Sequence, residues 1–362
     1  MDGKKGSSGR LAFLDAARGV AALLVVLEHG IQGWFPQFGE WSARHVHLGR
    51  VGVLLFLTIS GFIIPQSIQQ AGSNARFWLR RFFRLFPAYW LCILIVLLYV
   101  GLGGKYRLAA SNDPGTWLVN LTMCQGFLGY PHLLDLFWTL HLELIIYLSC
   151  SLLLALRLFR HARLLLAATA AAVLFAGTIL ARWRGQPLVL HPVLYFAAPM
   201  VGFVAYDLLH RRGSWLFSLA LLVAIVAVPL PIYLYNYRWL LPEHTRVYVH
   251  DYCVHYLGAY SLFFLMACLH GRRLHWSACR LGRISYSTYL MHAVLVVLLV
   301  DLPGPPWLRL GGLIVASVLV SEVCFRLVEE PGIALGRALE RRLFRAKAQA
   351  ANPDAGAERQ AA

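Results

Sequence analysis

Long apolar stretches recur along almost the whole chain, separated by short polar segments. Six of them are nearly free of charge, and four more are apolar but carry a few polar residues. Each is close to the ~20 residues that a helix needs to cross a bilayer. The pattern therefore predicts an all-α, polytopic membrane bundle of about ten transmembrane helices. The expected spans are 11–32, 51–75, 85–104, 134–156, 164–181, 185–206, 213–237, 252–271, 285–302 and 308–328.

The composition supports the same fold class. Of the 362 residues, 59% are hydrophobic and 14% are charged, which lies outside the range of ordinary soluble domains. We expect one membrane domain over 11–330, with 1–10 as a cytoplasmic N-terminus and 331–362 as a short basic cytoplasmic tail. An Arg inside the first apolar run, and no small-residue cleavage pattern near its end, predict a retained first helix rather than a cleaved signal peptide.

The distribution of charge explains the formal net charge of +16. About two thirds of the 33 Lys and Arg residues fall in alternate loops, on the side of the N-terminus. This bias is the positive-inside pattern, so we expect both termini in the cytoplasm and no nucleic acid partner. The seven cysteines contain no CxxC pair and predict no metal site. Cys124 and Cys253 both lie near the expected outward side, and whether they pair stays open.

The first span carries two unusual polar residues, Arg18 and His29. At ~100° and ~1.5 Å per residue, they share one stripe of the helix and lie ~16 Å apart along its axis. A cation inside a membrane span is costly, so it usually marks a functional site that faces a cavity or other helices. The spacing excludes a direct bond between the two side chains and suits the two ends of a long ligand.

Two further segments each allow two interpretations. Ser60 and Gly61 lie near the middle of the second span, where small residues let helices approach closely, or where Ser60 contacts substrate. The segment RFWLRRFFRLFPAYW holds Arg80, Arg81 and Arg84. These guanidinium groups either follow the positive-inside pattern or bind phosphate, for which their bidentate geometry is well suited.

Two later spans also carry polar side chains. Glu143 lies in FWTLHLELIIYL, two residues after His141, and serves either catalysis or an interhelix bond. A contact between Glu143 and His29 is possible, since both are expected in the outward half of the membrane. Ser285, Tyr289 and His292 share one face of the ninth span, which lines either a cavity or an interhelix seam.

The last span ends in FRLVEEPG. Arg326 and Glu329 are spaced i, i+3, which is compatible with a local ion pair.

Taken together and in this order, these segments resemble the acyltransferase-3 family of bacterial integral-membrane acyltransferases. The resemblance runs from LDAARGVAALLVVLEHG to VEEP, almost the whole chain. The family positions fall on Arg18 and His29; Arg80, Arg81, Phe86 and Pro87; Trp138, Thr139, Leu140 and Glu143; Ser285 to His292; and Glu329 and Pro331. Thr139 departs mildly from the Ser of the family pattern. Glu322, a charge inside the last span, is a second departure that could reflect a different acceptor.

The resemblance implies an enzyme of the bacterial cytoplasmic membrane. It would move an acyl group, commonly acetyl, from cytoplasmic acyl-CoA to a hydroxyl of an envelope carbohydrate or lipid-linked sugar. Acyl-CoA is then a donor substrate, and no tightly bound cofactor is expected. Some relatives carry an extracytoplasmic hydrolase-like domain, which we do not expect here. The candidate substrate-contacting positions are Arg80, Arg81, Arg84, Ser60, Trp138, Ser285, Tyr289, His292 and Glu329.

A mechanism follows as a hypothesis, with His29, Glu143 and Arg18 as catalytic residues. The Arg80 cluster would hold the phosphates of the donor, and Arg18 would guide it inward to His29. A neutral His29 would take the proton of the attacking hydroxyl, and Glu143 would hold its other ring nitrogen. In a second route, His29 itself carries the acyl group. The sequence does not separate these routes.

The acceptor site and the function class leave alternatives open. The outward segment 103–133, with Lys105, Arg107 and Asp113, is the candidate for acceptor contact. A transporter or flippase is the alternative function, with Arg18, Glu143 and His292 along a proton or substrate path. However, we find no inverted repeat or matched pair of broken spans. A purely structural subunit would not predict polar groups on one stripe, and no pattern indicates an oligomeric state.

Overall fold

The described part of the chain is almost entirely helical, with turns and short irregular connections between the helices. This structure is a computed structural model, and it describes residues 11–103, 113–188, 190–210, 213–239, 249–299 and 303–350. Within these ranges there is no strand, which confirms the all-α prediction. The elements are α1 (Ala12–Trp34), α2 (Pro36–His45), α3 (Leu48–Ala71), α4 (Asn74–Gly101), α5 (Pro114–Asn120), α6 (Phe137–Ala155), η1 (Leu158–His161), α7 (Ala162–Phe175), η2 (Ala176–Leu180), α8 (Ala181–Arg184), α9 (Leu190–Leu209), α10 (Trp215–Ala227), α11 (Pro229–Trp239), η4 (Tyr252–Leu257), α13 (Gly258–Ala267), α14 (Trp276–Arg283), α15 (Ser285–Leu299), α16 (Pro306–Cys324), η5 (Phe325–Glu329) and α17 (Glu330–Ala350).

The chain is a multi-pass membrane protein. Among the described residues, six helical segments are long and apolar enough to cross a bilayer, or seven if the bent pair α14 and α15 forms one span. The helix α1 has 23 residues but is not among the six. It carries Arg18, Glu28 and His29, which lower its hydropathy. Ten spans, and both termini in the cytoplasm, stay predictions.

Local signals explain how the second and third predicted spans are joined. Gly72 ends α3 with a φ of 70°, in the left-handed region where glycine is favoured. The Ser73 hydroxyl then accepts a hydrogen bond from the backbone N–H of Arg76, 3.3 Å away, and caps α4. The cap lies about two turns before Arg80, so the basic segment is helical and continuous with the span that follows.

Two glycines let the central helices pack closely. A Cβ atom at Gly61 of α3 would lie 1.9 Å from the carbonyl oxygen of Pro199 in α9. A Cβ atom at Gly282 of α14 would lie 1.8 Å from the carbonyl oxygen of Asp15 in α1. Both distances exclude any larger residue without movement of the backbone. The close-packing interpretation of Ser60 and Gly61 therefore holds for Gly61.

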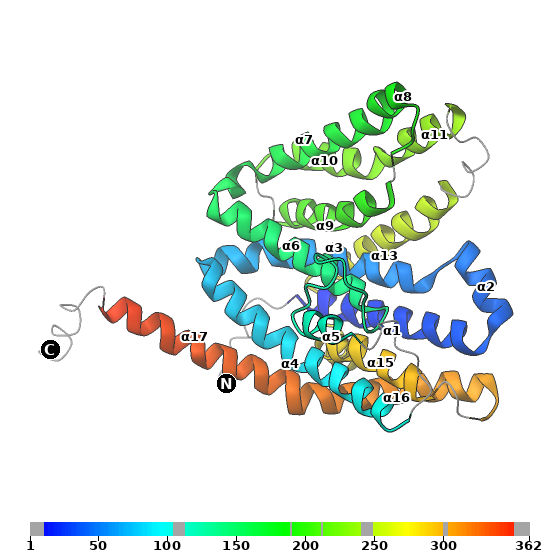
Figure 1. The fold of residues 1–362 in the computed structure, drawn as a ribbon. Helices are drawn as coiled ribbons and strands as arrows, with labels where there is room; N and C mark the ends of the chain where they lie inside the picture. The colour runs from blue at the N-terminus through cyan, green and yellow to red at the C-terminus, as the bar shows by residue number, and fades with distance from the viewer. Residues whose placement is uncertain are drawn as a thin grey trace, which may run out of the picture.

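The helix α1 lies inside the bundle, in contact with α3, α14, α15 and α16 (Figure 1). Its buried face includes Ala17, Ala21, Val25 and Glu28. The helices α7, α8, α10 and α11 form an outer layer above α9 in the view of Figure 1. The helix α9 packs on α3, and α3 packs on α1, so α9 and α3 lie between this layer and α1.

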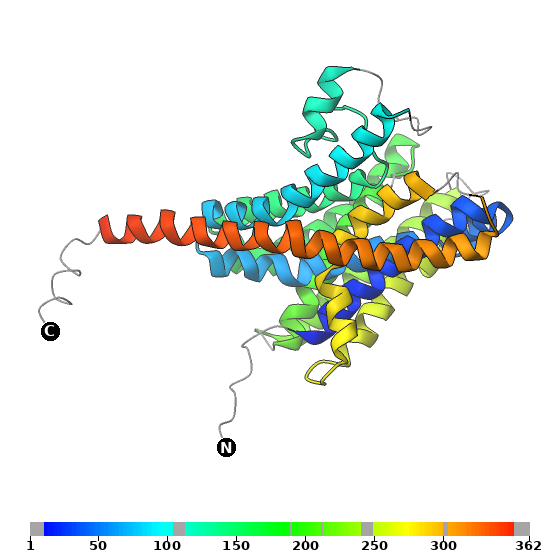
Figure 2. The ribbon, with the colours of Figure 1, turned by 90° about the horizontal axis from the view of Figure 1, so that it is seen from below.

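The last helices form one long rod that passes beyond the bundle. Helices α16, η5 and α17 follow each other with little change of direction, and α17 extends past the other helices (Figure 2). Near its start α17 packs on α4, where Phe83 lies over Gly332 and Gly336. Farther along, Arg80 forms two hydrogen bonds of 2.6 Å with Glu340. Residues 331–350 of the predicted tail are thus helical, and the part from Gly332 to Glu340 packs on α4.

Candidate functional site

Four central helices line a cavity that contains five of the predicted polar residues. Its volume is about 60 Å³. Arg18 enters it from α1, Ser60 from α3, Glu143 from α6, and Ser285 and Tyr289 from α15. The remaining lining residues are Val53, Phe56, Leu57, Thr139, Leu140 and Tyr286. Ser285 and Tyr289 of the polar stripe therefore line a cavity, and Ser60 lines it beside the close contact at Gly61.

The cavity combines positive and negative side chains. The Glu143 carboxylate accepts a hydrogen bond from the hydroxyl of Tyr147, one turn along α6. Arg18 lies within electrostatic range of Arg84, Glu143, Tyr147 and Arg81. Its Nε atom has no hydrogen-bond partner among the described residues. A buried guanidinium N–H without an acceptor is costly, so this group is available to an anionic or carbonyl ligand.

A pair of imidazoles lies next to this cavity. The rings of His29 and His292 are 5.1 Å apart between centroids. The Nδ1–H group of His29 donates to the carbonyl of Val25 at 2.9 Å, and that of His292 donates to the carbonyl of Thr288 at 3.1 Å. Both rings therefore keep the Nε2 lone pair available. The Nε2 atom of His292 is buried and has no partner among the described residues.

Tyr289 connects the cavity to the imidazole pair. Its ring centroid is 5.6 Å from that of His292. Its hydroxyl lies 2.6 Å from the Thr139 hydroxyl and donates to the carbonyl of Leu136 at 3.1 Å. The residues Arg18, Glu143, Tyr289, His292 and His29 thus form one polar path through the bundle. Thr139, a mild departure from the family pattern, supplies the hydroxyl that orients Tyr289.

One expected contact within this path is not formed. No hydrogen bond or ion pair joins Glu143 to His29 in the described part of the chain. The second nitrogen of the His29 ring is held by its own helix, through Val25, and Glu143 is bonded to Tyr147. The ring that approaches His29 belongs instead to His292 of α15.

The three arginines of α4 have different surroundings. Arg80 is 44% exposed and is bound to Glu340 of α17. Arg81 donates to the Ser67 hydroxyl at 3.0 Å and lies over the rings of Phe77 and Tyr147. Arg84 interacts electrostatically with Arg18 and with Glu329. Only Arg81 and Arg84 therefore lie toward the cavity.

The expected ion pair between Arg326 and Glu329 is wrong. Glu329 is 1% exposed and accepts a hydrogen bond from Ser287 at 2.7 Å, so it does not pair with Arg326. Arg326 binds Glu322 instead, at 2.5 Å. Glu322 also accepts from Nε of Arg280 at 2.8 Å. The unusual charge at Glu322 is thus explained by an ion pair between α14 and α16, and it does not lie in the cavity.

The other outward candidates do not reach the cavity. Trp138 packs on Tyr195, with 5.2 Å between ring centroids, and is 37% exposed. Cys124 and Cys253 are both free thiols, so they do not pair.

The outward segment that we considered for acceptor contact is only partly described. Lys105 and Arg107 lie outside the described residues. Asp113 caps α5 by accepting hydrogen bonds from Gly115 and Thr116. These bonds lower the pKa of the Asp113 carboxyl, most strongly through the Thr116 hydroxyl.

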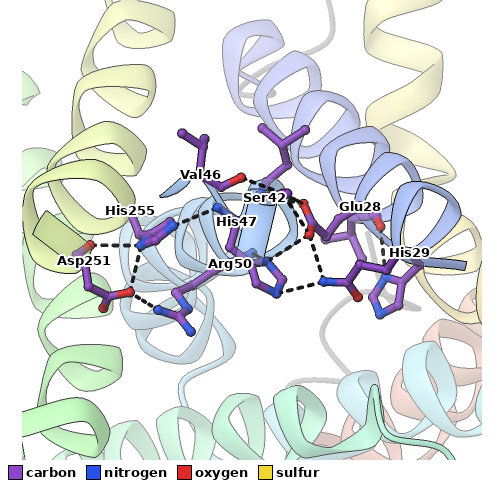
Figure 3. Close-up of polar contacts among 11 residues, drawn as sticks. Glu28, His29, Ser42, Val46, His47, Arg50, Asp251 and His255 are labelled. Atoms are coloured by element: carbon purple, nitrogen blue, oxygen red, sulfur yellow. Dashed lines mark hydrogen bonds and ion pairs between the residues drawn. The ribbon is translucent and has the colours of Figure 1, made fainter. Parts of the chain in front are cut away.

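The sequence interpretation missed a buried polar network beside His29 (Figure 3). Glu28 is 0% exposed, and its carboxylate lies 2.8 Å from Nε2 of Gln32, 3.0 Å from the Ser42 hydroxyl and 2.9 Å from the Leu48 backbone N–H. His47 lies 3.8 Å from the same carboxylate. The signal for this network in the sequence is Glu28 itself, a carboxylate inside a predicted membrane helix, directly before His29.

The network continues to a distant part of the chain. The backbone N–H of His47 donates to Nε2 of His255 at 2.8 Å, and Arg50 pairs with Asp251 (Figure 3). His47 lies between helices α2 and α3, where burial lowers the pKa of its imidazole. The network thus joins α1, α2, α3 and η4 around the C-terminal end of α1.

Comparison with known proteins identifies the family of the chain. A family described as an acyltransferase domain matches residues 11–326. Among curated relatives, acyltransferase MdmB of Streptomyces mycarofaciens is 30% identical over 155 residues, 40% of this chain and 39% of that protein. Nodulation protein 10 of Rhizobium leguminosarum bv. viciae is 30% identical over 189 residues, 46% of this chain and 50% of that protein. The matched regions thus span half or less of these relatives, and no solved structure matches. The chain belongs to the acyltransferase-3 family.

Proposed function

We propose that this protein is a membrane O-acyltransferase of the bacterial cytoplasmic membrane. It moves an acyl group, most simply acetyl, from cytoplasmic acyl-CoA to a hydroxyl of an envelope carbohydrate or lipid-linked sugar. The observation that carries the proposal is the polar path from the cavity at Arg18, through Tyr289, to the His29 and His292 pair. Family membership and the acyltransferase name of one relative support it.

The donor approaches through the arginines of α4. Arg84 and Arg81 lie within electrostatic range of Arg18, so positive charge continues from the N-terminal part of α4 into the cavity. One guanidinium group can bind two oxygens of a phosphate at once, so these arginines are suited to bind the phosphates at the nucleotide end of CoA. Arg80 is already bound by Glu340, so its role in this proposal is to hold α4 against α17.

The thioester reacts near His29. The Val25 carbonyl holds the Nδ1–H group, so the lone pair of Nε2 is free to take the proton of the acceptor hydroxyl. The alkoxide oxygen attacks the thioester carbon, the carbon–sulfur bond breaks, and the proton passes from His29 to the leaving CoA thiolate. In the covalent route, Nε2 of His29 attacks the thioester carbon and the carbon–sulfur bond breaks, which releases CoA thiolate and leaves an acyl-imidazolium. The acceptor hydroxyl then attacks the acyl carbon, the carbon–nitrogen bond breaks to restore the neutral imidazole, and the hydroxyl proton passes to the CoA thiolate through water.

His292 and Tyr289 assist this step in the proposal. The unpartnered Nε2 of His292 lies in the ring next to His29, where it can accept a hydrogen bond from a substrate hydroxyl. The Tyr289 hydroxyl is held by Thr139 and Leu136, which fixes the wall between the two rings and the cavity.

The test uses the purified protein, acetyl-CoA and a panel of carbohydrate acceptors. We expect binding of acetyl-CoA and release of CoA thiol that depends on an acceptor and on His29. Failure to bind acetyl-CoA, with no thiol release, would contradict the proposal. Trapping an acetyl group on His29 would favour the covalent route. A rate that requires both substrates bound together would favour direct transfer. Proton or solute movement in vesicles, without acyl transfer, would favour the transporter alternative.

A further inference from the structure

The short helix α2 presents an exposed row of aromatic rings. The ring centroids of Phe38 and Trp41 are 5.3 Å apart, and those of Trp41 and His45 are 5.0 Å apart, with the rings stacked in both pairs. His250, which precedes η4, lies at the end of the row, 6.3 Å from His45. Phe38 is 50% exposed and Trp41 is 48% exposed. We call these four residues the α2 ladder.

The buried network of Glu28 holds the α2 ladder beside His29. Ser42 follows Trp41 in the chain, and its hydroxyl lies 3.0 Å from the carboxylate of Glu28. Glu28 in turn precedes His29 on α1, as Figure 3 shows. In addition, Gly39 of α2 packs against Gln32, where an added Cβ would lie 3.1 Å from the Gln32 Cα. The ladder is therefore fixed to the same helical turn as His29.

The polarity of α2 indicates which ligand fits. Glu40 and Arg44 form an ion pair of 3.9 Å, with side chains 74% and 77% exposed. The hydrocarbon of the bilayer would leave these charges unsolvated, so α2 is not buried in it. The His45 ring donates through Nδ1 to the Trp41 carbonyl, which leaves Nε2 as an acceptor for an external hydroxyl. The face thus combines aromatic rings with hydrogen-bonding groups.

A pyranose ring has the matching surface. One face carries C–H groups with a small positive charge, which are attracted to the negative face of an aromatic ring. Its edge carries hydroxyls, which bond to imidazole, carboxylate and guanidinium groups. Small-molecule sites in proteins are commonly lined by apolar and aromatic side chains, with a few polar groups that set the orientation of the ligand.

We propose that the α2 ladder is the binding site for a pyranose unit of the acceptor, placed so that a hydroxyl of the bound sugar reaches His29. This inference rests on the proposed function. It assigns acceptor recognition to Phe38, Trp41, His45 and His250. The segment 103–133 that the sequence suggested is not required for it.

The experiment compares Trp41→Ala and Trp41→Phe with the wild type and with the control Trp307→Ala. Trp307 is 68% exposed at the start of α16 and lies outside the α2 ladder. The probes are the methyl pyranosides of glucose, galactose, mannose and N-acetylglucosamine. Their binding to the purified protein is measured by saturation-transfer NMR. CoA release is measured against the concentration of each pyranoside, and acetyl-CoA binding is measured separately.

We expect Trp41→Ala to raise the KM for the pyranoside about tenfold, the effect of losing one aromatic contact. The kcat value and the affinity for acetyl-CoA should stay unchanged, and Trp41→Phe should retain most of the affinity. If Trp41→Ala had the same KM for the pyranoside as Trp307→Ala, the inference would be overturned. It would also be overturned if the wild-type protein bound none of the four probes. Loss of activity only in vesicles, with an unchanged KM in detergent, would assign the ladder to lipid contact and overturn it too. The proposed function fails separately, if the wild type does not bind acetyl-CoA.

Discussion

Replacement of His29 by alanine separates chemistry from folding. The side chain makes one hydrogen bond, to the Val25 carbonyl of its own helix, and it is half-buried. Losing one such bond costs about 0.5–1.5 kcal/mol of stability. Losing a general base costs about 10²- to 10⁴-fold in turnover, or roughly 3–5 kcal/mol of activation free energy. The expected loss of turnover therefore exceeds the expected loss of stability.

A matched control is available in the same chain. His210 also bonds through Nδ1 to the carbonyl one turn earlier, that of Tyr206, at 3.0 Å. His210→Ala removes the same kind of bond, and it lies outside the polar path.

Both variants are assayed by the rate of CoA thiol release with acetyl-CoA and an acceptor, and by thermal unfolding in detergent. We expect His29→Ala to lose at least a hundredfold in rate, and His210→Ala to stay within about twofold. A folded His29→Ala protein with a rate close to the wild type would refute both routes through this imidazole.

Three further predictions concern packing, pH and donor binding. Gly61→Ala should lower the free energy of unfolding by about 3 kcal/mol or more, because its Cβ would meet the Pro199 carbonyl at 1.9 Å. Gly33→Ala is the control, because no atom lies within 4 Å of the added Cβ and the free energy of unfolding should stay unchanged. Equal melting temperatures of the two variants would contradict the close packing of Gly61 on Pro199. Burial lowers the pKa of His47, so the unfolded chain binds more protons there. The free energy of unfolding that this group contributes is then complete above its ordinary pKa of ~6.5 and is lost as the pH falls. His47→Gln should flatten this part of the curve of unfolding free energy against pH. An unchanged curve would exclude His47 as the cause of the pH dependence. Arg84→Gln should raise the KM for acetyl-CoA about tenfold or more, with the KM for the acceptor unchanged. An unchanged KM for acetyl-CoA would mean that Arg84 only follows the positive-inside pattern and does not bind the donor.

Periodicity predicted those parts of the site that lie on one helix. Ser285 and Tyr289 are one turn apart, so both enter the same cavity, and Glu143 enters it from an otherwise apolar span. Arg18 was recognised because a cation in a span has few structural explanations. These inferences need only helical geometry and the cost of burying charge.

Contacts between helices could not be predicted in the same way. The pairing of His29 with His292 depends on how α1 and α15 are rotated about their axes, which spacing within one helix does not define. The predicted pair of Arg326 and Glu329 assumed a regular α-helix, but η5 is π-helical, and its wider turn directs Glu329 toward Ser287. Arg80 is bound by Glu340 from the tail, far along the chain.

The carboxylate of Glu28 also has a consequence for how the protein is made. Its hydrogen-bond donors come from its own helix, from Ser42 in α2 and from the first residue of α3, Leu48. During synthesis, α1 leaves the ribosome before the later two donors exist. An ionised carboxylate without donors is poorly tolerated in lipid. We therefore expect α1 to become stable in the bilayer only once α3 has arrived, so that biogenesis treats residues 12–71 as one insertion unit.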